Sequence, residues 1–266
     1  MATERITSRD NQRLVNARKV RDGKIANQIF IEGKRLAVEA FRSGVEVAEC
    51  FLREGFHDKH LAEVIAERNC DVSELPDRIF ESIADTKNSQ GIVLIGKRPA
   101  HTLESIKRRL NSSPVPIVVV LTEINNPSNL GAVLRTAEAA GIAGVIVTEN
   151  SADAYSAKTL RASMGAAFRL PIVEYANFRD ILHWAKAEGI TTTAAAATAP
   201  KTYADIDWMR KRLLIFGSEA HGLENIDIEQ IDETVSIPME NNVESLNLAV
   251  SAGILLFEAR RQNVSG

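Results

Sequence analysis

The side chains best suited to chemistry lie in one short polar stretch, which contains Asn129 and ends at Arg135. Gly131 and Arg135 are four positions apart, so a helix would place them on one face, where the glycine leaves room for a ligand beside the guanidinium. A guanidinium in that place can clamp a phosphate or a carboxylate. The competing interpretation is an arginine that forms only a salt bridge at an interface.

A second polar stretch, residues 217–223, has glycine at its first and at its next-to-last position. Gly217 lets a backbone or a ligand come close, and Gly222 permits a positive φ. Glu219 lies between these two glycines, and its carboxylate is suited either to a reactive centre or to capping a loop or helix.

A third polar stretch, residues 237–247, leads into the last expected helix. Ser245 and Asn247 lie at the start of that helix, and either side chain can cap its free N–H groups. Capping and a role in a site can coexist in such residues, as they can in Asn129.

Apolar runs precede all three stretches. Residues 117–121, 213–216 and 235–237 are rich in β-branched or aliphatic side chains and end at turn-forming residues, which predicts buried strands. A helical segment is expected at residues 132–140, and a last helix, apolar on most of its surface, at residues 246–260. Strands that alternate with helices in this way predict an α/β fold.

Taken together, the three stretches resemble the three motifs of the SpoU (TrmH) family of RNA ribose 2′-O-methyltransferases, in the SPOUT superfamily. Asn-Pro-x-Asn-x-Gly…Arg occupies residues 126–135, Gly-Ser-Glu-x-x-Gly-Leu occupies residues 217–223, and Ile-Pro-Met…Ser-Leu-Asn occupies residues 237–247. Their order is that of the family, and three motifs in order are far more specific than one. His221 and residues 241–242 depart from the residues that many members carry there, arginine and glycine.

The resemblance implies a C-terminal parallel α/β sheet tied in a trefoil knot, an exception to the rule that chains do not thread loops. It also implies S-adenosylmethionine as the cofactor, and a two-fold homodimer through the last helix and the helix after Gly131. The cofactor would be bound by Thr148, Gly217, Ile237, Leu246, Asn247 and Ala249. The catalytic centre would comprise Asn129, Arg135, Glu219, Ser245 and Asn247.

Methyl transfer from a sulfonium is an in-line substitution, in which positioning and electrostatics dominate. The attacking 2′-hydroxyl is a poor acid, so its proton must be removed or its developing charge stabilised. Arginine is an awkward general base because its guanidinium stays protonated. We therefore interpret Arg135 first as a clamp on an RNA phosphate, and a role as the base is the alternative.

The N-terminal part of the chain carries the charges expected of an RNA-binding surface. Residues 1–24 hold seven Lys or Arg against three acidic residues, whereas residues 219–244 hold eight acidic residues and no basic one. This asymmetry lets one face meet phosphates, although a solvated charged face is the alternative. The helices and strands before residue 97 resemble the family's small α/β, ribosomal-protein-like RNA-binding domain. RNA contacts are expected from Arg9, Arg18, Arg21, Lys34 and Arg35.

A stretch dense in proline, asparagine and serine, residues 97–116, predicts a boundary between two domains. We expect an RNA substrate-binding domain at residues 1–98, a linker at residues 99–116 and a methyltransferase domain at residues 117–266. The N-terminal domain has too few aromatic side chains for a base-stacking platform, which predicts recognition of RNA by its shape and phosphates.

Composition narrows the remaining possibilities. The net charge of the chain is only −3, and its two cysteines suit a reducing compartment. No apolar run reaches the length of a membrane span, so we expect a cytoplasmic protein without a membrane partner. His57 and His60 have no further ligands nearby, so no metal is expected. Residues 91–97 have the spacing of a phosphate-binding loop, but Arg98 replaces the required Ser or Thr.

These expectations combine into one function: 2′-O-ribose methylation of structured RNA that depends on S-adenosylmethionine. Ribosomal RNA is favoured because the N-terminal domain resembles that of rRNA-directed members, and transfer RNA is the runner-up. A non-catalytic RNA-binding protein on the same fold is a further alternative. It is disfavoured because Asn129, Arg135 and the other expected catalytic residues are all present.

Overall fold

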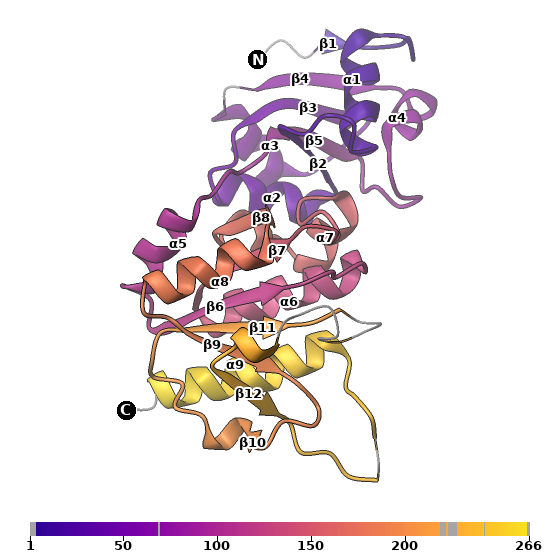
Figure 1. Ribbon diagram of the computed structural model, residues 1–266. Helices are drawn as coiled ribbons and strands as arrows, with labels where there is room; N and C mark the ends of the chain where they lie inside the picture. Colours follow the sequence, from indigo (N-terminus) through magenta and orange to yellow (C-terminus); the bar gives the residue numbers. More distant parts are fainter. Residues whose placement is uncertain (1–3, 69, 219–221, 223–227, 242, 265–266) are drawn as a thin grey trace. The chain divides into compact units, whose positions relative to one another are not determined.

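The computed structural model describes residues 4–68, 70–218, 222, 228–241 and 243–264 (Figure 1). Contacts within the chain divide it into two compact units. Unit 1 comprises Met1–Pro99 and Tyr155–Phe168, and unit 2 comprises Ala100–Ala154 and Arg169–Gly266. Among the described residues, no helix is both long and apolar enough to cross a membrane.

Unit 1 is built on a five-stranded mixed sheet with the strand order β1-β4-β3-β5-β2. Strands β1, β4 and β3 run parallel, whereas β5 pairs antiparallel with both β3 and β2. The strands are β1 (Glu4–Arg5), β2 (Gln28–Glu32), β3 (Val47–Arg53), β4 (Asp71–Leu75) and β5 (Ile92–Lys97). The helices are α1 (Gln12–Arg21), α2 (Lys34–Arg42), α3 (Lys59–Ala66), α4 (Asp77–Ile83) and α7 (Ala157–Ser163).

Both faces of the sheet in unit 1 are covered by helices, which explains why β5 is apolar almost throughout. Val93 and Ile95 of β5 share a core with buried residues of α1 and α4, among them Phe80. Helices α2 and α3 contact each other, and α2 also contacts β2 and β5. The residues of β5 that alternate with Val93 and Ile95 therefore face α2.

Unit 2 is built on a seven-stranded sheet with the order β10-β12-β9-β11-β6-β7-β8, in which every pair is parallel. The strands are β6 (Val115–Leu121), β7 (Ile142–Thr148), β8 (Ile172–Ala176), β9 (Thr191–Ala195), β10 (Lys201–Thr202), β11 (Arg212–Phe216) and β12 (Glu233–Ser236). The helices are α5 (Leu103–Leu110), α6 (Pro127–Ala140), α8 (Phe178–Ala187) and α9 (Leu248–Val264).

Alternate residues of β6 point into two separate cores. Val118 and Val120 pack with buried residues of α5 and α8. Helices α6 and α9 contact each other, and α9 also contacts β6, so they cover the other face of the sheet (Figure 1). Because all seven strands are parallel, their carboxyl ends meet at one edge, which is where open α/β sheets bind their ligands.

The helix after the first motif begins earlier than the predicted segment at residues 132–140. Helix α6 starts at Pro127, because Asn126 caps it by accepting the N–H of Ser128 on Oδ1 (2.9 Å) and proline suits the first helical position. The expected polar turn is therefore the first turn of the helix itself, and Asn129 lies inside it.

Other boundaries were also displaced by capping and by turns. The last helix spans Leu248–Val264 rather than residues 246–260, because Asn247 is its cap. The threonine- and alanine-rich residues 191–199 form a strand only as far as Ala195. Within residues 99–116, α5 forms on a capping box between Thr102 and Ser105.

Candidate active site

Residues of the motifs lie at the carboxyl edge of the sheet in unit 2. Thr148 is the last residue of β7, Gly217 follows β11 directly, and Ile237 follows β12 directly. The ends of β6 and β11 are tied together there, because the hydroxyl of Thr122 donates to the carbonyl of Phe216 (2.9 Å). The parallel register thus gathers segments far apart in the sequence at one edge.

A hollow of about 160 Å³ opens at this edge. Thr148 and Gly222 both line it, so the hollow joins the end of β7 to the second motif. The buried Thr148 hydroxyl accepts the N–H of Glu123 (3.4 Å) and donates to the carbonyl of Glu149 (3.3 Å). Glu123 adopts a positive φ of 54°, which turns the chain sharply between β6 and α6.

The first and third motifs meet through two asparagines. Asn247 uses its Oδ1 to accept the N–H of Ala249 (2.9 Å), which caps α9. The same side chain donates from Nδ2 to Oδ1 of Asn129 (3.3 Å), 118 residues away in the sequence. A single amide therefore fixes the start of α9 against the first turns of α6.

Arg135 lies farther along α6, with its side chain exposed. It forms no ion pair with any residue that the structure describes, so the guanidinium is available to an anionic ligand. Gly131 is buried in α6, whereas Arg135, one turn farther along the same helix, is exposed.

The residues expected to bind the cofactor differ in burial. Gly217, Ile237, Leu246 and Ala249 are half-buried, whereas Asn247 and Ser245 are exposed. Half-buried apolar side chains with a few polar groups suit a small ligand that has both an aromatic and a charged part. Ser218 and Gly222 close the second motif's turn with paired backbone hydrogen bonds (2.7 and 2.9 Å), and Gly222 takes a φ of 56°. Glu219 and His221 lie outside the described residues.

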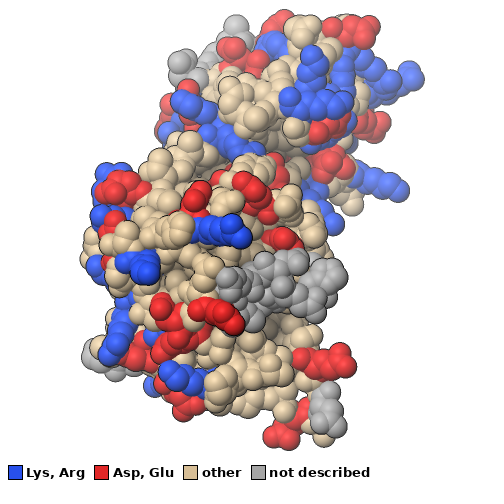
Figure 2. Space-filling model, viewed as in Figure 1, with Lys and Arg blue, Asp and Glu red and all other residues tan. Residues whose placement is uncertain are grey.

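In unit 1, the expected RNA-binding arginines near the N-terminus donate hydrogen bonds to backbone carbonyls. Arg21 donates to the carbonyls of Ser82, Ile83 and Ala84, which lie at the end of α4. Arg9 donates to the carbonyl of Arg78 (3.2 Å), and Arg18 donates to the carbonyl of Arg9 (2.8 Å). These contacts hold α1 and α4 together. Figure 2 shows Lys and Arg side chains, with Asp and Glu among them, over the part of unit 1 that bears α1 and α4.

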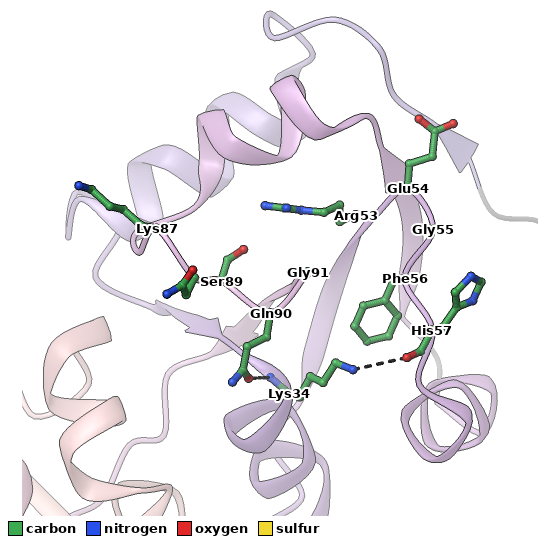
Figure 3. A pocket seen from close by; sticks show the side chains of 11 residues that line it. Lys34, Arg53, Glu54, Gly55, Phe56, His57, Lys87, Ser89, Gln90 and Gly91 are labelled. Carbon is green, nitrogen blue, oxygen red and sulfur yellow. Dashed lines mark hydrogen bonds between the residues drawn. The ribbon is translucent and has the colours of Figure 1, made fainter.

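Lys34 and Arg35 occupy the first turn of α2. The backbone N–H of Lys34 already donates to Oε1 of Gln90 (2.9 Å). Arg35 is exposed, and Lys34 lines a hollow of about 460 Å³ in unit 1 (Figure 3). Sequence reasoning missed the other cations of this hollow, Arg53 and Lys87, because they come from separate loops. The signal in the sequence that could have indicated this hollow was Gly91, since a glycine permits the positive φ found there.

Comparison with known proteins decides the family. Residues 116–257, more than half of the chain, match the SpoU rRNA Methylase family. Residues 30–102 match the RNA 2′-O ribose methyltransferase substrate-binding family. The chain belongs to the SpoU rRNA methylase family. It is therefore an RNA methyltransferase whose two matched parts are a substrate-binding segment and a catalytic segment.

Individual relatives are similar to this protein along most or nearly all of its chain. The 23S rRNA (guanosine-2′-O)-methyltransferase RlmP of Bacillus subtilis is 28% identical over 260 residues, which are 97% of this chain and 99% of that protein. The 23S rRNA (guanosine-2′-O-)-methyltransferase RlmB of Escherichia coli is 32% identical over 232 residues, 85% of this chain and 96% of that protein. The crystal structure of an AdoMet-bound rRNA methyltransferase from Sinorhizobium meliloti superimposes with a TM-score of 0.82, at 28% identity, and covers 97% of this chain and 98% of that one.

The part of the chain that the structure describes contains no cluster of metal ligands. No group of three or more His, Cys, Asp or Glu side chains lies close enough to hold an ion there. The site is instead made of amides, hydroxyls, small apolar residues and one exposed guanidinium, a set suited to orienting a hydroxyl and a phosphate.

Proposed function

We propose that this protein transfers a methyl group from S-adenosylmethionine to a ribose 2′-hydroxyl of ribosomal RNA. The observation that carries the proposal is the hydrogen bond between Asn129 and Asn247, which joins the first and third motifs at the carboxyl edge of a SpoU-family sheet. Support for ribosomal RNA comes from RlmP and RlmB, which are named as 23S rRNA enzymes and match both units of this chain.

The proposed cofactor site comprises Thr148, Gly217, Ile237, Leu246, Asn247 and Ala249. S-adenosylmethionine supplies the methyl group and a sulfonium leaving group. The half-buried apolar side chains of Ile237 and Leu246 would cover its apolar parts, and the absence of a side chain at Gly217 would let the backbone approach it.

Arg135 and Asn129 have separate proposed roles in the reaction. The protonated guanidinium of Arg135 would hold a phosphate of the RNA and so aim the neighbouring ribose. The Asn129 amide, whose Oδ1 is fixed by Asn247, would orient the attacking hydroxyl. Ser245 is exposed at the same edge and would contact the substrate, as would Glu219 of the second motif.

Unit 1 would supply most of the RNA-binding surface. We propose contacts from Arg9, Arg18, Arg21, Lys34 and Arg35, of which Arg35 is exposed at the start of α2. Arg21 would act mainly by holding α4 in place, since three carbonyls already accept its hydrogen bonds. We propose a substrate-binding domain at residues 1–98 and a methyltransferase domain at residues 117–266. Residues 99–116, the expected linker, contain α5, which packs in the core of unit 2.

Three further properties are proposed with the reaction. The strand order, with β11 between β6 and β9, is compatible with a trefoil knot in the C-terminal part of the chain. We also propose a homodimer through α9 and α6. A cytoplasmic location is supported by two cysteines that form no disulfide and by relatives that act on ribosomal RNA.

The test is methyl transfer from labelled S-adenosylmethionine to unmodified 23S rRNA and to unmodified tRNA. Wild type should label the ribose of 23S rRNA. Arg135→Ala should lower the rate about a hundredfold while cofactor binding is kept. Arg210→Ala is the matched control, since Arg210 is an exposed arginine of unit 2 at the start of β11, away from the carboxyl edge.

Each result of this test separates the candidate functions. If only the ribose of tRNA is labelled, the substrate is transfer RNA and not ribosomal RNA. Cofactor binding without labelling of either RNA would favour a non-catalytic RNA-binding protein. Absence of cofactor binding would contradict the proposal at its centre.

A further inference from the structure

A hollow in unit 1 is built from three separate segments (Figure 3). They are the start of α2 at Lys34, the loop after β3 from Arg53 to His57, and the loop before β5 from Lys87 to Gly91. Its volume of about 460 Å³ lies in the range of sites that hold a small ligand. Side chains from three loops that converge on one hollow make a candidate binding site.

The walls of this hollow are held in a specific backbone geometry. Gln90 and Gly91 both have positive φ, 59° and 77°, which is uncommon for a glutamine. The Oε1 of Gln90 accepts the N–H of Lys34 (2.9 Å), which ties the loop to the open end of α2. A Cβ on Gly91 would lie 3.2 Å from the ring of Phe56, so the ring packs tightly on that glycine. The loop is therefore positioned rather than loose.

An aromatic ring forms one side of the hollow. Phe56 is half-buried, and the ammonium of Lys34 lies 5.0 Å from its ring centre. Lys34 is fixed there because it also donates to the carbonyl of His57 (3.4 Å) and pairs with Asp58 (3.2 Å). Hydrogen bonds from the N–H of Leu61 and then from Lys34 lower the pKa of Asp58, so this carboxylate stays charged at neutral pH. Ring and cation together are suited to a flat, electron-rich group.

Two polar side chains of the hollow lack hydrogen-bond partners. Ser89 is only 2% exposed and its hydroxyl has none. The Nε of Arg53 also has none, although the guanidinium lies 3.6 Å from Asp77. Buried polar groups without partners are destabilising, so they favour a ligand that supplies acceptors. Figure 3 shows Ser89 and Arg53 directed toward the same hollow.

The charge of the hollow favours an anionic ligand. Lys87 is exposed and, among the described residues, has no partner. The one acidic residue of the lining, Glu54, is already paired with Arg5 (2.8 Å). Lys34 and Arg53 are paired with Asp58 and Asp77, so Lys87 is the cation of the lining that leaves positive charge beside the aromatic wall.

We infer that this hollow binds a single unpaired nucleotide of the RNA substrate. Its phosphate lies between Lys87 and Arg53, its base stacks on Phe56, and Ser89 and Gln90 hydrogen-bond to it. The inference rests on the proposed function, since it takes the ligand to be RNA. It also refines the sequence-based expectation of recognition by shape and phosphates: one aromatic side chain makes a nucleotide pocket without forming a stacking platform.

The first experiment measures the affinity of the full-length protein for a fluorescent 23S rRNA transcript at several salt concentrations. Phe56→Leu keeps an apolar side chain but removes the ring, and the dissociation constant should rise about tenfold. Lys87→Ala should lower the slope of log affinity against log salt by about 0.7, the value for one lost phosphate contact on a single strand. Arg42→Ala, at the far end of α2 and exposed, is the matched control and should change neither quantity by as much.

A second experiment tests whether the nucleotide is unpaired. Wild type should bind a single-stranded RNA of about 12 nucleotides more tightly than a blunt duplex of the same length. Phe56→Leu should lose that preference, and Phe56→Trp should keep it because the larger ring still stacks. Lys87 is exposed, so Lys87→Ala leaves the fold intact even where a substitution at Phe56 lowers the melting temperature.

The outcomes separate this inference from the proposed function. Wild type that neither binds nor methylates 23S rRNA would contradict both. Wild type that methylates 23S rRNA, with Phe56→Leu and Lys87→Ala behaving like Arg42→Ala, would overturn the pocket and leave the reaction standing. If Phe56→Leu loses affinity equally for single-stranded RNA and for duplex, the inference that the bound nucleotide is unpaired would be overturned.

Discussion

At the scale of single residues, the amide of Asn247 serves two purposes. Its oxygen caps α9 by accepting the N–H of Ala249, and its nitrogen donates to Asn129 on α6. Capping stabilises the helix, whereas the second bond orients a residue of the proposed catalytic centre. These contributions can be separated, because a serine can cap without reaching across to α6.

Two substitutions of Asn247 test that separation. Asn247→Ala should destabilise unit 2 by about 1 kcal/mol and lower methyl transfer, because both hydrogen bonds are lost. Asn247→Ser should keep nearly full stability in urea unfolding, yet lower kcat at least about tenfold because Asn129 is no longer oriented. Full activity of Asn247→Ser would show that the bond to Asn129 is not needed.

Substitutions of Arg135 can distinguish its two possible roles, a clamp on an RNA phosphate and a general base. A lysine keeps the positive charge but loses the paired hydrogen bonds, so Arg135→Lys should retain a fraction of the rate at every pH. If position 135 acted as the base, the lysine variant would gain activity steeply as pH rises toward the ordinary lysine pKa of about 10.4. The measurement is kcat/KM for RNA between pH 7 and 9.5, for wild type, Arg135→Lys and Arg135→Ala.

At the scale of elements, a buried ion pair holds the strands of unit 2 together at the edge opposite the site. Arg212 of β11 is 2% exposed and hydrogen-bonds to Thr193 of β9 and to Glu233 of β12 (2.6 Å). Its guanidinium also lies 5.5 Å from the ring centre of Trp208. One side chain thus links three neighbouring strands.

Glu233→Gln should destabilise unit 2 by roughly 2–4 kcal/mol in urea unfolding, because it leaves the Arg212 charge buried without a counter-charge. Burial alone would raise the pKa of Glu233, but hydrogen bonds from Arg212 and Lys201 outweigh it and the pKa is lowered. The stability that this pair contributes is therefore present above the ordinary glutamate pKa of about 4.3 and is lost as pH falls through the lowered value. Glu229→Gln, an exposed change in the same unit, should leave stability and its acid dependence unchanged.

The strand β3 of unit 1 carries a thiol that native packing should protect. Cys50 is fully buried, and desolvation raises the pKa of its thiol far above the ordinary range. Iodoacetamide at pH 8 should leave Cys50 unmodified in the folded protein and alkylate it once urea unfolds unit 1. Mass spectrometry of the corresponding peptide measures this, and rapid alkylation of the native protein would show that β3 opens readily.

At the scale of the whole molecule, α9 presents an apolar stripe to its surroundings. Val250, Phe257 and Val264 are seven positions apart and each is about half exposed (50%, 49% and 48%). Spacing by seven places them on one face of the helix, opposite residues that pack inward such as Leu255. An exposed apolar stripe is a common mark of a subunit interface, which supports the proposed homodimer.

Phe257→Glu should therefore convert a dimer into a monomer in sedimentation experiments, because a charge would be buried at the interface. Lys186→Glu, which alters an exposed residue of α8, is the control and should remain dimeric. In such a dimer, Arg135 of one subunit would act beside the cofactor site of the other. Mixing the impaired variants Arg135→Ala and Asn247→Ala should then restore part of the methyl transfer. A wild-type protein that sediments as a monomer would contradict the proposal.

Local sequence signals by themselves determined much of this protein. The β-branched runs predicted strands such as β6 and β11, and the three ordered motifs identified the family. Capping also followed from local chemistry, since Asn247 was one of two residues expected to cap the last helix. Periodicity and caps act between residues a few positions apart, so they can be read along the chain.

Only the tertiary structure decided which distant residues meet. It placed Asn247 against Asn129 across 118 residues, and it buried Gly131 while Arg135, four positions on, is exposed. It also brought the segment that holds Arg53 and Phe56 and the loop that holds Lys87 around one hollow. Such encounters depend on strand order and helix packing, which result from the burial of the whole core and leave no periodic signal in any one segment.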